Sequence, residues 1–435
     1  MIKRYQDKTI AEIWQLNNKF KKMLEIEILA LEGMAENGDI PSDVVERIKS
    51  KATFTVDEIL EEEKITRHDV VAFVNVVSRY IGEDAQYFHR GLTSSDVLDT
   101  TFVLLNLDSL RYIKSLWQGL LEGLMSVAEK YKYLPQIGRT HGIHAEPMTL
   151  GLKFLGYHFE GMRVLEKLNQ VIDDISYVKL SGAVGTYANV PPYVEEYVAK
   201  KLGLKRFMPA TQVISRDVFA DVVWAIAKLM SALKRWAINF RLMDLTEILE
   251  IQEPFYKGQA GSSAMPHKKN PISWERITGL ARVVESYVNV ALENNDLWFE
   301  RDISHSSTER IIFPDMYHIA AYSTELMTKL INDIRINEKH IQKNLEHLRG
   351  LVFAGRLLVS LMAKGYVREE AYHIVQSLSM KVWEDESLNL KDVVKSELSN
   401  IFSEEEIEEI FDVNYYLRYI DYIFDNYGNS YGSLS

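Results

Sequence analysis

The chain has 435 residues, of which 47% are hydrophobic and 26% charged, a composition that allows a globular protein to fill a hydrophobic core. Its formal net charge is −12 and it has no run of five or more basic residues, so we expect no nucleic-acid partner. Cysteine is absent, which excludes disulfides, thiolate metal sites and cysteine nucleophiles and fits a reducing cytoplasm.

The first ninety residues are predicted to form helices, because their apolar residues recur at helical spacing. The predicted helices cover 9–33, 44–63 and about 69–80. Thr9 and Glu12 have the spacing of a capping box at the start of the first helix. Gly82 and Gly91 interrupt the pattern before a polar turn, so we place an N-terminal helical domain at 1–93.

Beyond this turn the helical patterns become unusually long. They cover 96–131, 148–178, 217–251, 276–294 and 313–337. Helices of this length must bury apolar stripes against one another, which predicts an all-α fold with a long central bundle over 94–341. Shorter helices, one with a capping box of Ser403 and Glu406, are predicted in a C-terminal helical domain over 342–435.

No stretch approaches the roughly 18–20 uncharged apolar residues that a membrane-spanning helix needs. The N-terminal sequence also lacks the apolar core of a signal peptide. We therefore expect no membrane association and a cytoplasmic location.

Loops rich in small and polar residues separate the long helices and carry the candidate chemistry, and they are predicted over 138–147, 181–192 and 258–271. The segment 258–271 combines glycines, the pair Ser262 and Ser263, and a cationic cluster between two prolines. It lacks the Gly-Lys-Ser/Thr of a phosphate-binding P-loop. A plain surface loop is the alternative reading, but a loop of this length in a helical protein is usually functional or disordered.

Residues 261–271, Gly-Ser-Ser-Ala-Met-Pro-His-Lys-Lys-Asn-Pro, resemble the signature loop of the fumarase/aspartase superfamily. Members of that superfamily are all-α homotetramers that eliminate fumarate from a substituted succinate. Further segments resemble one of its families, the adenylosuccinate lyases, and together they cover nearly the whole chain. These segments are 4–5, 66–70, 91–96, 138–142, 181–187, 211–212 and 301–307.

The resemblance implies a reaction, a substrate and an assembly. The chain is expected to split adenylosuccinate into AMP and fumarate, and to split the succinyl-carboxamide ribotide (SAICAR) of earlier purine synthesis to AICAR. No metal or organic cofactor is implied. In the family, each site forms where helices of three subunits converge, so a homotetramer with shared sites is expected.

Elimination of fumarate needs a base for a weakly acidic carbon proton, an acid for the departing nitrogen, and donors for the charge that develops. The resemblance assigns the base to Ser262, with Ser263 as the open alternative, and Lys268 is expected to stabilise the alkoxide. His141 is the candidate general acid, because imidazole titrates near neutral pH. His144 lies three residues further on, but two histidines without a third ligand give little support for a metal site.

The substrate-binding residues follow from the resemblance alone. The groups expected to hold the succinyl carboxylates are Thr93, Ser94, Thr140, Gln212, Lys268 and Asn270. The groups expected to hold the nucleotide and its phosphate are Arg4, Tyr5, Arg67, Asp69, Arg276, Arg301, Ser306 and Arg310. Arginine suits this task because its planar fork pairs with oxyanions at two points. His68 and His89 are expected to bind phosphate or orient another group, with a structural role as the alternative, and the role of His267 stays open.

Three positions depart from the family pattern. Lys269 stands where arginine is frequent, Trp274 where a small or polar residue is usual, and Phe299 where a histidine is common. They lie beside the expected chemistry, so we expect them to tune affinity and to remove no catalytic group.

Two other functions stay open at this point. The first is another reaction of the superfamily, such as argininosuccinate cleavage. The segment 66–69 and the pair Arg4-Tyr5 favour a nucleotide substrate instead. The second is an inactive long-helix scaffold, which is disfavoured because the loops hold acid, base and cationic groups and no heptad pattern is sustained.

Overall fold

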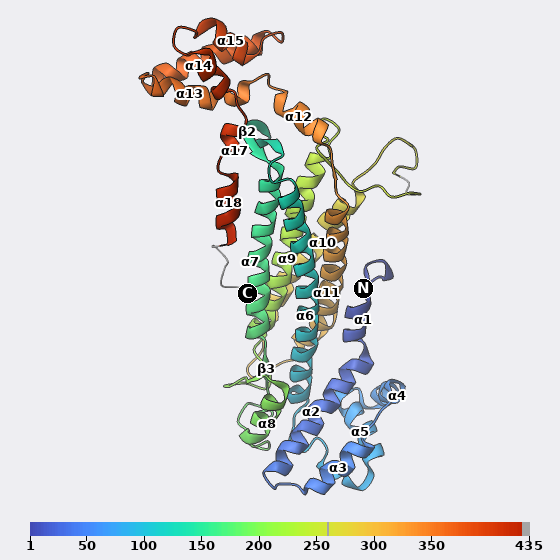
Figure 1. The fold of residues 1–435 in the computed structure, drawn as a ribbon. Coiled ribbons are helices and arrows are strands. Elements are labelled where there is room, and N and C mark those ends of the chain that lie inside the picture. Colours follow the sequence, from blue (N-terminus) through green and yellow to red (C-terminus); the bar gives the residue numbers. More distant parts are fainter. Residues whose placement is uncertain (259–260, 429–435) are drawn as a thin grey trace. The chain divides into compact units, whose positions relative to one another are not determined.

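The computed structural model describes residues 1–258 and 261–428, which fold into helices joined by loops and short strands (Figure 1). Gln259 and Ala260 of the signature loop, and residues 429–435, lie outside the described residues. The chain forms two compact units. Unit 1 comprises 1–119, 161–235 and 276–327, and unit 2 comprises 120–160, 236–275 and 328–435. The three consecutive domains expected from the sequence follow other boundaries and stay a prediction.

The predicted all-α fold is confirmed by the long helices at the centre of the chain. They are α6 Ser94–Lys130, α7 Leu150–Asp174, α9 Arg216–Met243, α10 Ile272–Glu293 and α11 Ser304–Asn332. The two largest errors in the predicted bounds are at one end of α9 and one end of α11. The helix α9 ends at Met243 and not at Ile251, and α11 begins at Ser304 and not at Phe313, since Asp302 caps it by accepting a hydrogen bond from the Ser304 amide at 2.7 Å.

Each unit has an aromatic core of its own. In unit 1, Phe102 of α6 packs against Phe219 of α9 and Phe313 of α11, with ring centroids 4.8 Å away in both cases. In unit 2, Phe240 of α9 stacks on Phe154 of α7 at 5.7 Å and contacts Trp274 of α10 at 5.5 Å. Helices that bury rings in this way are held at fixed positions within their unit.

The N-terminal part of unit 1 is a group of short helices around α2. Its elements are η1 Lys3–Tyr5, α1 Lys8–Trp14, α2 Leu16–Glu36, α3 Ser42–Lys51, α4 Val56–Thr66, α5 Asp69–Ile81 and η2 Gly82–Tyr87. The single helix predicted over 9–33 is broken at Gln15, and its cap is Asp7, which accepts from the Ile10 amide at 2.8 Å, so the predicted Thr9–Glu12 box was wrong. The helix predicted over 44–63 divides because Thr55 starts α4 through a capping box with Glu58.

Unit 1 also holds the segment between α7 and α9. Here β3 Tyr177–Val178 pairs in parallel with β4 Lys205–Arg206, and α8 Pro192–Leu202 lies between them in sequence. Residues of α8 join α2 and α5 in one buried hydrophobic cluster.

Unit 2 contains an antiparallel hairpin and the C-terminal helices. The hairpin is β1 Pro135–Thr140 and β2 Ile143–Thr149, so the loop expected over 138–147 was wrong. A second pair joins β5 Ile251–Gln252 to β6 Arg335–Ile336. The remaining elements are α12 Glu338–Glu346, η3 Leu351–Phe353, α13 Ala354–Ala363, α14 Arg368–Glu384, α15 Leu390–Glu397, α16 Glu404–Ile410, α17 Asn414–Leu417 and α18 Ile420–Tyr427.

The capping box of Ser403 and Glu406 at α16 is confirmed. Across the described residues, no helix is both long and apolar enough to span a membrane.

Candidate active site

The candidate general acid, His141, lies at the tip of the β1–β2 hairpin in unit 2. The strands pair up to Thr140 and Ile143, so His141 and Gly142 form a two-residue turn. Both have positive φ, 56° and 81°, as a type I′ hairpin turn requires. A non-glycine residue in this region is uncommon and held there by its surroundings. The turn leaves the His141 side chain exposed, next to the exposed Thr140.

The described part of the signature loop, 261–271, closes on itself in unit 2. The side-chain amide of Asn270 donates to the carbonyl oxygen of Gly261 at 2.8 Å, and the Lys268 amide donates to the Met265 carbonyl oxygen at 3.0 Å. A Cβ atom at Gly261 would lie 1.8 Å from the Lys268 carbonyl oxygen, so only glycine permits this approach. We call this closed segment, residues 261–270, the loop ring.

Within the loop ring, the two serines differ. The Ser262 hydroxyl oxygen accepts from the Met265 amide at 3.1 Å and from the Ala264 amide at 3.4 Å, and the side chain is half-buried. Ser263 is exposed. Backbone donors directed at a hydroxyl oxygen stabilise negative charge on it. Ser262 is therefore the serine whose surroundings suit an alkoxide.

The end of the loop ring is attached to the segment that follows α9. The Glu253 carboxylate accepts from the Ser273 amide at 2.9 Å and from the Trp274 amide at 3.2 Å. A carboxylate at a helix N-terminus satisfies free amides there. Glu253 thus fixes the start of α10, into which the loop ring leads.

The loop ring and the end of α9 also enclose a cavity of about 980 Å³ in unit 2. Lys268 and Asn270 line it together with His267 and Glu275. The lining therefore contains cationic and amide groups of the kind that hold carboxylates.

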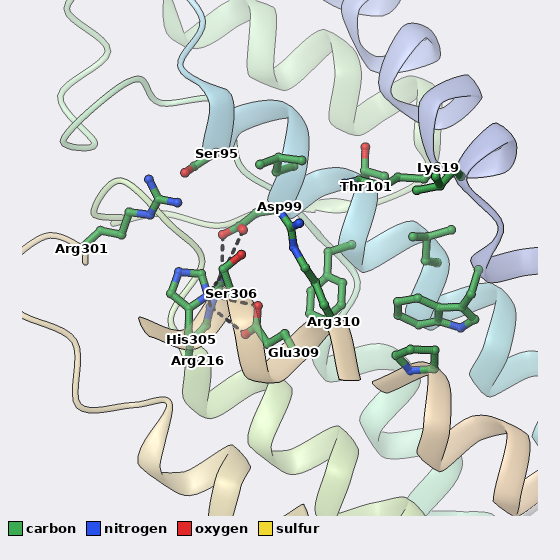
Figure 2. Close-up of a pocket in the computed structure, with 16 residues that line it drawn as sticks. Lys19, Ser95, Asp99, Thr101, Arg216, Arg301, His305, Ser306, Glu309 and Arg310 are labelled. Carbon is green, nitrogen blue, oxygen red and sulfur yellow. Dashed lines mark hydrogen bonds and ion pairs between the residues drawn. The ribbon is translucent and has the colours of Figure 1, made fainter. Parts of the chain in front are cut away.

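In unit 1, a cavity of about 320 Å³ gathers residues of α1, α2, α6, α9 and α11 (Figure 2). Three residues expected to bind the nucleotide line it, Arg301, Ser306 and Arg310. Ser306 and Arg310 lie in the first turns of α11, where the helix terminus favours anions. The lining also includes the apolar side chains of Trp14 and Phe102.

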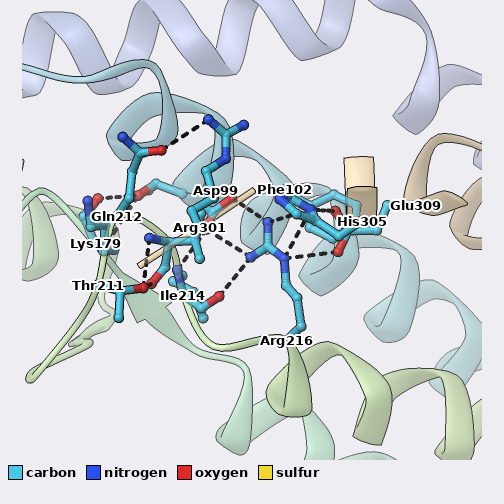
Figure 3. Close-up of polar contacts among 12 residues, drawn as sticks. Asp99, Phe102, Lys179, Thr211, Gln212, Ile214, Arg216, Arg301, His305 and Glu309 are labelled. Carbon is cyan, nitrogen blue, oxygen red and sulfur yellow. Dashed lines mark hydrogen bonds and ion pairs between the residues drawn. The ribbon is translucent and has the colours of Figure 1, made fainter. Parts of the chain in front are cut away.

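A buried polar network forms one wall of this cavity (Figure 3). Arg216 donates to both oxygens of Asp99 at 2.9 Å, and its Nε lies 3.1 Å from Glu309 Oε1. Arg216 also donates to Nδ1 of His305 at 3.2 Å, and all four side chains are less than a tenth exposed. The pKa of Arg216 is raised, since burial lowers it but the charges of Asp99 and Glu309 outweigh burial.

The network fixes the segments that carry predicted substrate residues. Asp99 Oδ2 accepts from the Ile214 amide at 2.7 Å, which holds the chain directly after Gln212. The Gln212 side chain in turn accepts from Arg301 Nη1 at 3.0 Å (Figure 3). The structure therefore brings the Gln212 and Arg301 side chains together through a hydrogen bond.

Asp69 is brought to Arg310 by a shared ion pair. Its Oδ2 lies 3.2 Å from Arg310 Nη2 and 3.2 Å from Lys19 Nζ. Burial would raise the pKa of Asp69, but these two cations hold it below its usual value. The neighbouring His68 caps α5, its Nδ1 accepting from the Val71 amide at 3.4 Å, and Arg67 is exposed in a left-handed conformation.

His89 is bound to the buried Glu27. Its Nδ1 lies 2.6 Å from Glu27 Oε1, and Glu27 is 1% exposed. Burial would lower the pKa of His89, but the hydrogen bond and charge of Glu27 raise it. A raised pKa favours the positively charged form of the imidazole, which is the form that a phosphate ligand requires.

Thr93 and Ser94 lie at the start of α6. The Thr93 amide donates to Asp96 Oδ2 at 2.9 Å, and Asp96 Oδ1 lies 2.6 Å from Lys179 Nζ with both side chains fully buried. Burial raises the pKa of Asp96 although Lys179 opposes it. The pair also binds the backbone of Gly182, so two segments of the family pattern share one anchor.

Tyr5 and Arg276 meet through a residue that the sequence did not single out. Arg276 Nη1 donates to the Tyr322 hydroxyl at 2.8 Å, and the Tyr322 ring packs edge-on against Tyr5 at 5.3 Å. Arg4 is exposed beside Tyr5.

The three departures from the family pattern have separate surroundings. Trp274 is fully buried in the core of unit 2 and packs against Phe240, and its effect on affinity stays a prediction. Lys269 lies over the Phe255 ring at 5.7 Å. Phe299 is 93% exposed with a φ of 53°, and its role stays a prediction.

His144 forms no metal site that the described residues reveal, since they contain no group of three or more His, Asp or Glu side chains that could hold an ion. Its ring packs edge-on against His347 at 5.8 Å.

Comparison with known proteins gives the family. A family model described as "Lyase" matches residues 3–285, and one described as "Adenylosuccinate lyase C-terminus" matches residues 350–427. The adenylosuccinate lyase of Thermotoga maritima is 44% identical over 98% of this chain and 99% of its own length. That of Bacillus subtilis is 41% identical over 98% of this chain and 100% of its own. The chain belongs to the adenylosuccinate lyase family.

Solved structures agree on the fold. A fumarate lyase from Mesorhizobium sp. BNC1 has a TM-score of 0.88 at 25% identity and covers 98% of this chain and 99% of that chain. The β-carboxy-cis,cis-muconate cycloisomerase of Acinetobacter calcoaceticus has a TM-score of 0.86 at 24% identity and covers 98% of both chains. Family membership makes this chain a carbon–nitrogen lyase.

The predicted site residues of this adenylosuccinate lyase family member fall into two groups. Those in unit 2 are Thr140, His141, Ser262, Ser263, Lys268 and Asn270. Those in unit 1 are Arg4, Tyr5, Arg67, His68, Asp69, His89, Thr93, Ser94, Gln212, Arg276, Arg301, Ser306 and Arg310. The acid and base candidates therefore share one unit, and the nucleotide candidates share the other.

Several polar residues that hold the candidates were missed from the sequence. Lys19, Asp99 and Tyr322 lie inside helical patterns and Arg216 directly precedes one, and a charged or polar residue there looks like any solvated position. A buried charge leaves no mark on helical spacing, so no sequence signal identified them.

Proposed function

We propose that the chain eliminates fumarate from adenylosuccinate to give AMP, and from SAICAR to give AICAR, by general acid–base catalysis. The observation that carries the proposal is the Ser262 hydroxyl within the loop ring. Its oxygen accepts hydrogen bonds from the backbone amides of Ala264 and Met265, and the cationic Lys268 belongs to the same closed segment. This is the environment that a serine base needs.

The base step takes a proton from the substrate carbon next to a carboxylate. Ser262, as an alkoxide stabilised by the Ala264 and Met265 amides, accepts that proton. The electron pair of the broken C–H bond is delocalised into the carboxylate. Lys268 and Asn270, with Thr93, Ser94, Thr140 and Gln212, hold the succinyl carboxylates and stabilise this charge.

The acid step releases the nucleotide. His141 gives its proton to the departing nitrogen, the carbon–nitrogen bond breaks with its electron pair on nitrogen, and the remaining electron pair forms the double bond of fumarate. The exposed position of His141 at a hairpin tip lets it reach a substrate held by other residues.

The nucleotide is held by the residues of unit 1. Arg301, Ser306 and Arg310 contact the phosphate or sugar, and Arg4, Tyr5 and Arg276 assist them. Arg67 and His68, at the start of α5, are further contacts, and Asp69 acts by orienting Arg310. His89, with its raised pKa, pairs with an anionic group of the substrate.

The working assembly is a homotetramer in the cytoplasm, with sites shared between subunits. The exposure of His141, Thr140 and Lys268 on one chain supports this arrangement, because groups that bind a small substrate must be covered by further protein. Size-exclusion chromatography with activity measured at the same concentration tests it, and a fully active monomer would overturn it.

Fumarate release from adenylosuccinate, followed by absorbance with argininosuccinate as the comparison substrate, tests the reaction. Ser262→Ala is expected to lower kcat by on the order of 10³-fold, with Ser263→Ala as the matched control that retains most activity. Absence of fumarate from adenylosuccinate, or full turnover by folded Ser262→Ala, would overturn the assignment.

A further inference from the structure

One buried carboxylate, Glu250, anchors the hairpin that carries His141. It is fully buried and accepts four side-chain hydrogen bonds within unit 2. Arg139 donates to Oε1 at 2.7 Å and to Oε2 at 3.0 Å, Gln136 donates to Oε2 at 2.7 Å, and Asn344 donates to Oε1 at 2.9 Å. Each carboxylate oxygen therefore accepts from two donors, so the buried carboxylate is fully hydrogen-bonded.

The backbone of Glu250 is fixed as firmly as its side chain. Its amide donates to the Met243 carbonyl at the end of α9 at 2.9 Å, and its carbonyl accepts from the Asn337 amide at 2.9 Å. The carboxylate thus projects from a point that is held on both sides.

Arg139 transmits this position to the hairpin. A guanidinium bound to both oxygens of one carboxylate is fixed in plane and direction, and Arg139 is two residues before His141 in β1. The strands are irregular at Gly138, where a Cβ would lie 2.9 Å from the Glu146 carbonyl oxygen. The bulge weakens the ladder below Arg139, so the hairpin tip depends on the Arg139 fork for its direction.

His141 has no restraint of its own. Within the described residues, no hydrogen bond or ion pair of its imidazole is found, and its side chain is exposed. Its direction is therefore set by the turn, with His141 and Gly142 at positive φ, and the turn is set by the residues below it. A displacement of about 1 Å at a catalytic group costs on the order of 10² in rate.

We propose that Glu250 is a positioning residue for the general acid, which acts through Arg139 to aim His141 at the departing nitrogen. This rests on the proposed function, because it needs His141 to be the acid. The competing account is that Glu250 only stabilises unit 2.

Gln136 separates the two accounts. It donates to the same carboxylate from the same strand and is fully buried, but it lies on the far side of the Gly138 bulge from His141. Gln136→Met removes one donor to Glu250 and preserves volume, so it takes a hydrogen bond from the same buried carboxylate without releasing the Arg139 fork.

The experiment measures kcat, KM, AMP affinity and thermal stability for the full chain and for Glu250→Gln, Arg139→Lys and Gln136→Met. Glu250→Gln and Arg139→Lys are expected to lower kcat about 10- to 100-fold, with KM and AMP affinity within about twofold, because binding by other residues is untouched. Gln136→Met is expected to lose stability while it keeps kcat within about threefold.

Two outcomes would overturn the proposal. One is a folded Arg139→Lys or Glu250→Gln enzyme with the kcat of the unmodified chain. The other is a Gln136→Met enzyme with the same kcat loss, which would show a structural role only. An unmodified chain that releases no fumarate would instead remove the proposed function, so the two failures are distinguishable.

Discussion

Gly261→Ala is the sharpest test of the loop ring. The added Cβ would lie 1.8 Å from the Lys268 carbonyl oxygen, whereas real Cβ atoms essentially never come closer than 3.0 Å, so the ring must open by at least 3.0 − 1.8 = 1.2 Å. The obstructing atom is backbone and cannot rotate away. Ser262 directly follows Gly261, and Lys268 supplies the contacting oxygen. The displacement therefore moves the proposed base and the cationic residue of the same loop.

A displacement of this size is expected to lower kcat about 100-fold, measured as fumarate release at saturating adenylosuccinate. The fold should be intact by circular dichroism, since the loop ring is largely exposed. The matched control is Gly279→Ala in α10, where an added Cβ meets nothing within 4 Å, so activity should be retained. A Gly261→Ala enzyme with kcat within about threefold of the unmodified chain would refute the reasoning.

Three further substitutions test single contacts. Glu27→Gln removes the partner that raises the pKa of His89. His89 should then lose its positive charge at a lower pH, so the KM for substrate should begin to rise at a lower pH than in the unmodified chain. Identical pH profiles of KM would contradict this. Arg216→Met leaves two buried carboxylates without their cation and should lower the free energy of unfolding by about 3–5 kcal/mol, measured as a lower urea midpoint. Arg47→Met, in an exposed ion pair, is the control and should leave the midpoint unchanged. Equal midpoints for the two variants would count against a buried network. Tyr322→Phe removes the hydroxyl that accepts from its arginine partner and should weaken AMP binding by calorimetry with kcat retained, and unaltered AMP affinity would exclude that role.

Apolar spacing predicted the long helices well, because each buries a continuous stripe that the sequence displays. It failed where tertiary contacts decide a bound. The break at Gln15 has neither proline nor glycine, but the Trp14 indole donates to Ser109 of α6 at 2.9 Å and the Asn18 side chain closes the turn on Ile13. The helix predicted from residue 313 begins at Ser304 instead, because the Asp302 side chain caps it there.

The sequence indicated the exposed and loop residues of the candidate site, but it did not single out the buried residues that hold them. Ser262 and His141 were proposed from the sequence because they belong to a family pattern in loops. Arg216 and Glu250 were not, since a charged residue in or beside a helical pattern looks solvated until its partners are known. The hairpin under His141 was also missed, because Gly138 and Pro147 resemble loop residues in sequence although they lie within the paired strands.

The short connection after α9 has a consequence for how the chain can vary. Glu250 holds the hairpin of the candidate acid, and Glu253, three positions later, holds the exit of the loop ring. The turn that leads to them is closed by backbone bonds, with the Leu249 amide donating to the Leu245 carbonyl at 2.7 Å. The exposed side chains of Leu245, Thr246 and Glu247 can change, but the length of the turn cannot, because inserting or deleting one residue would shift both carboxylates out of register together.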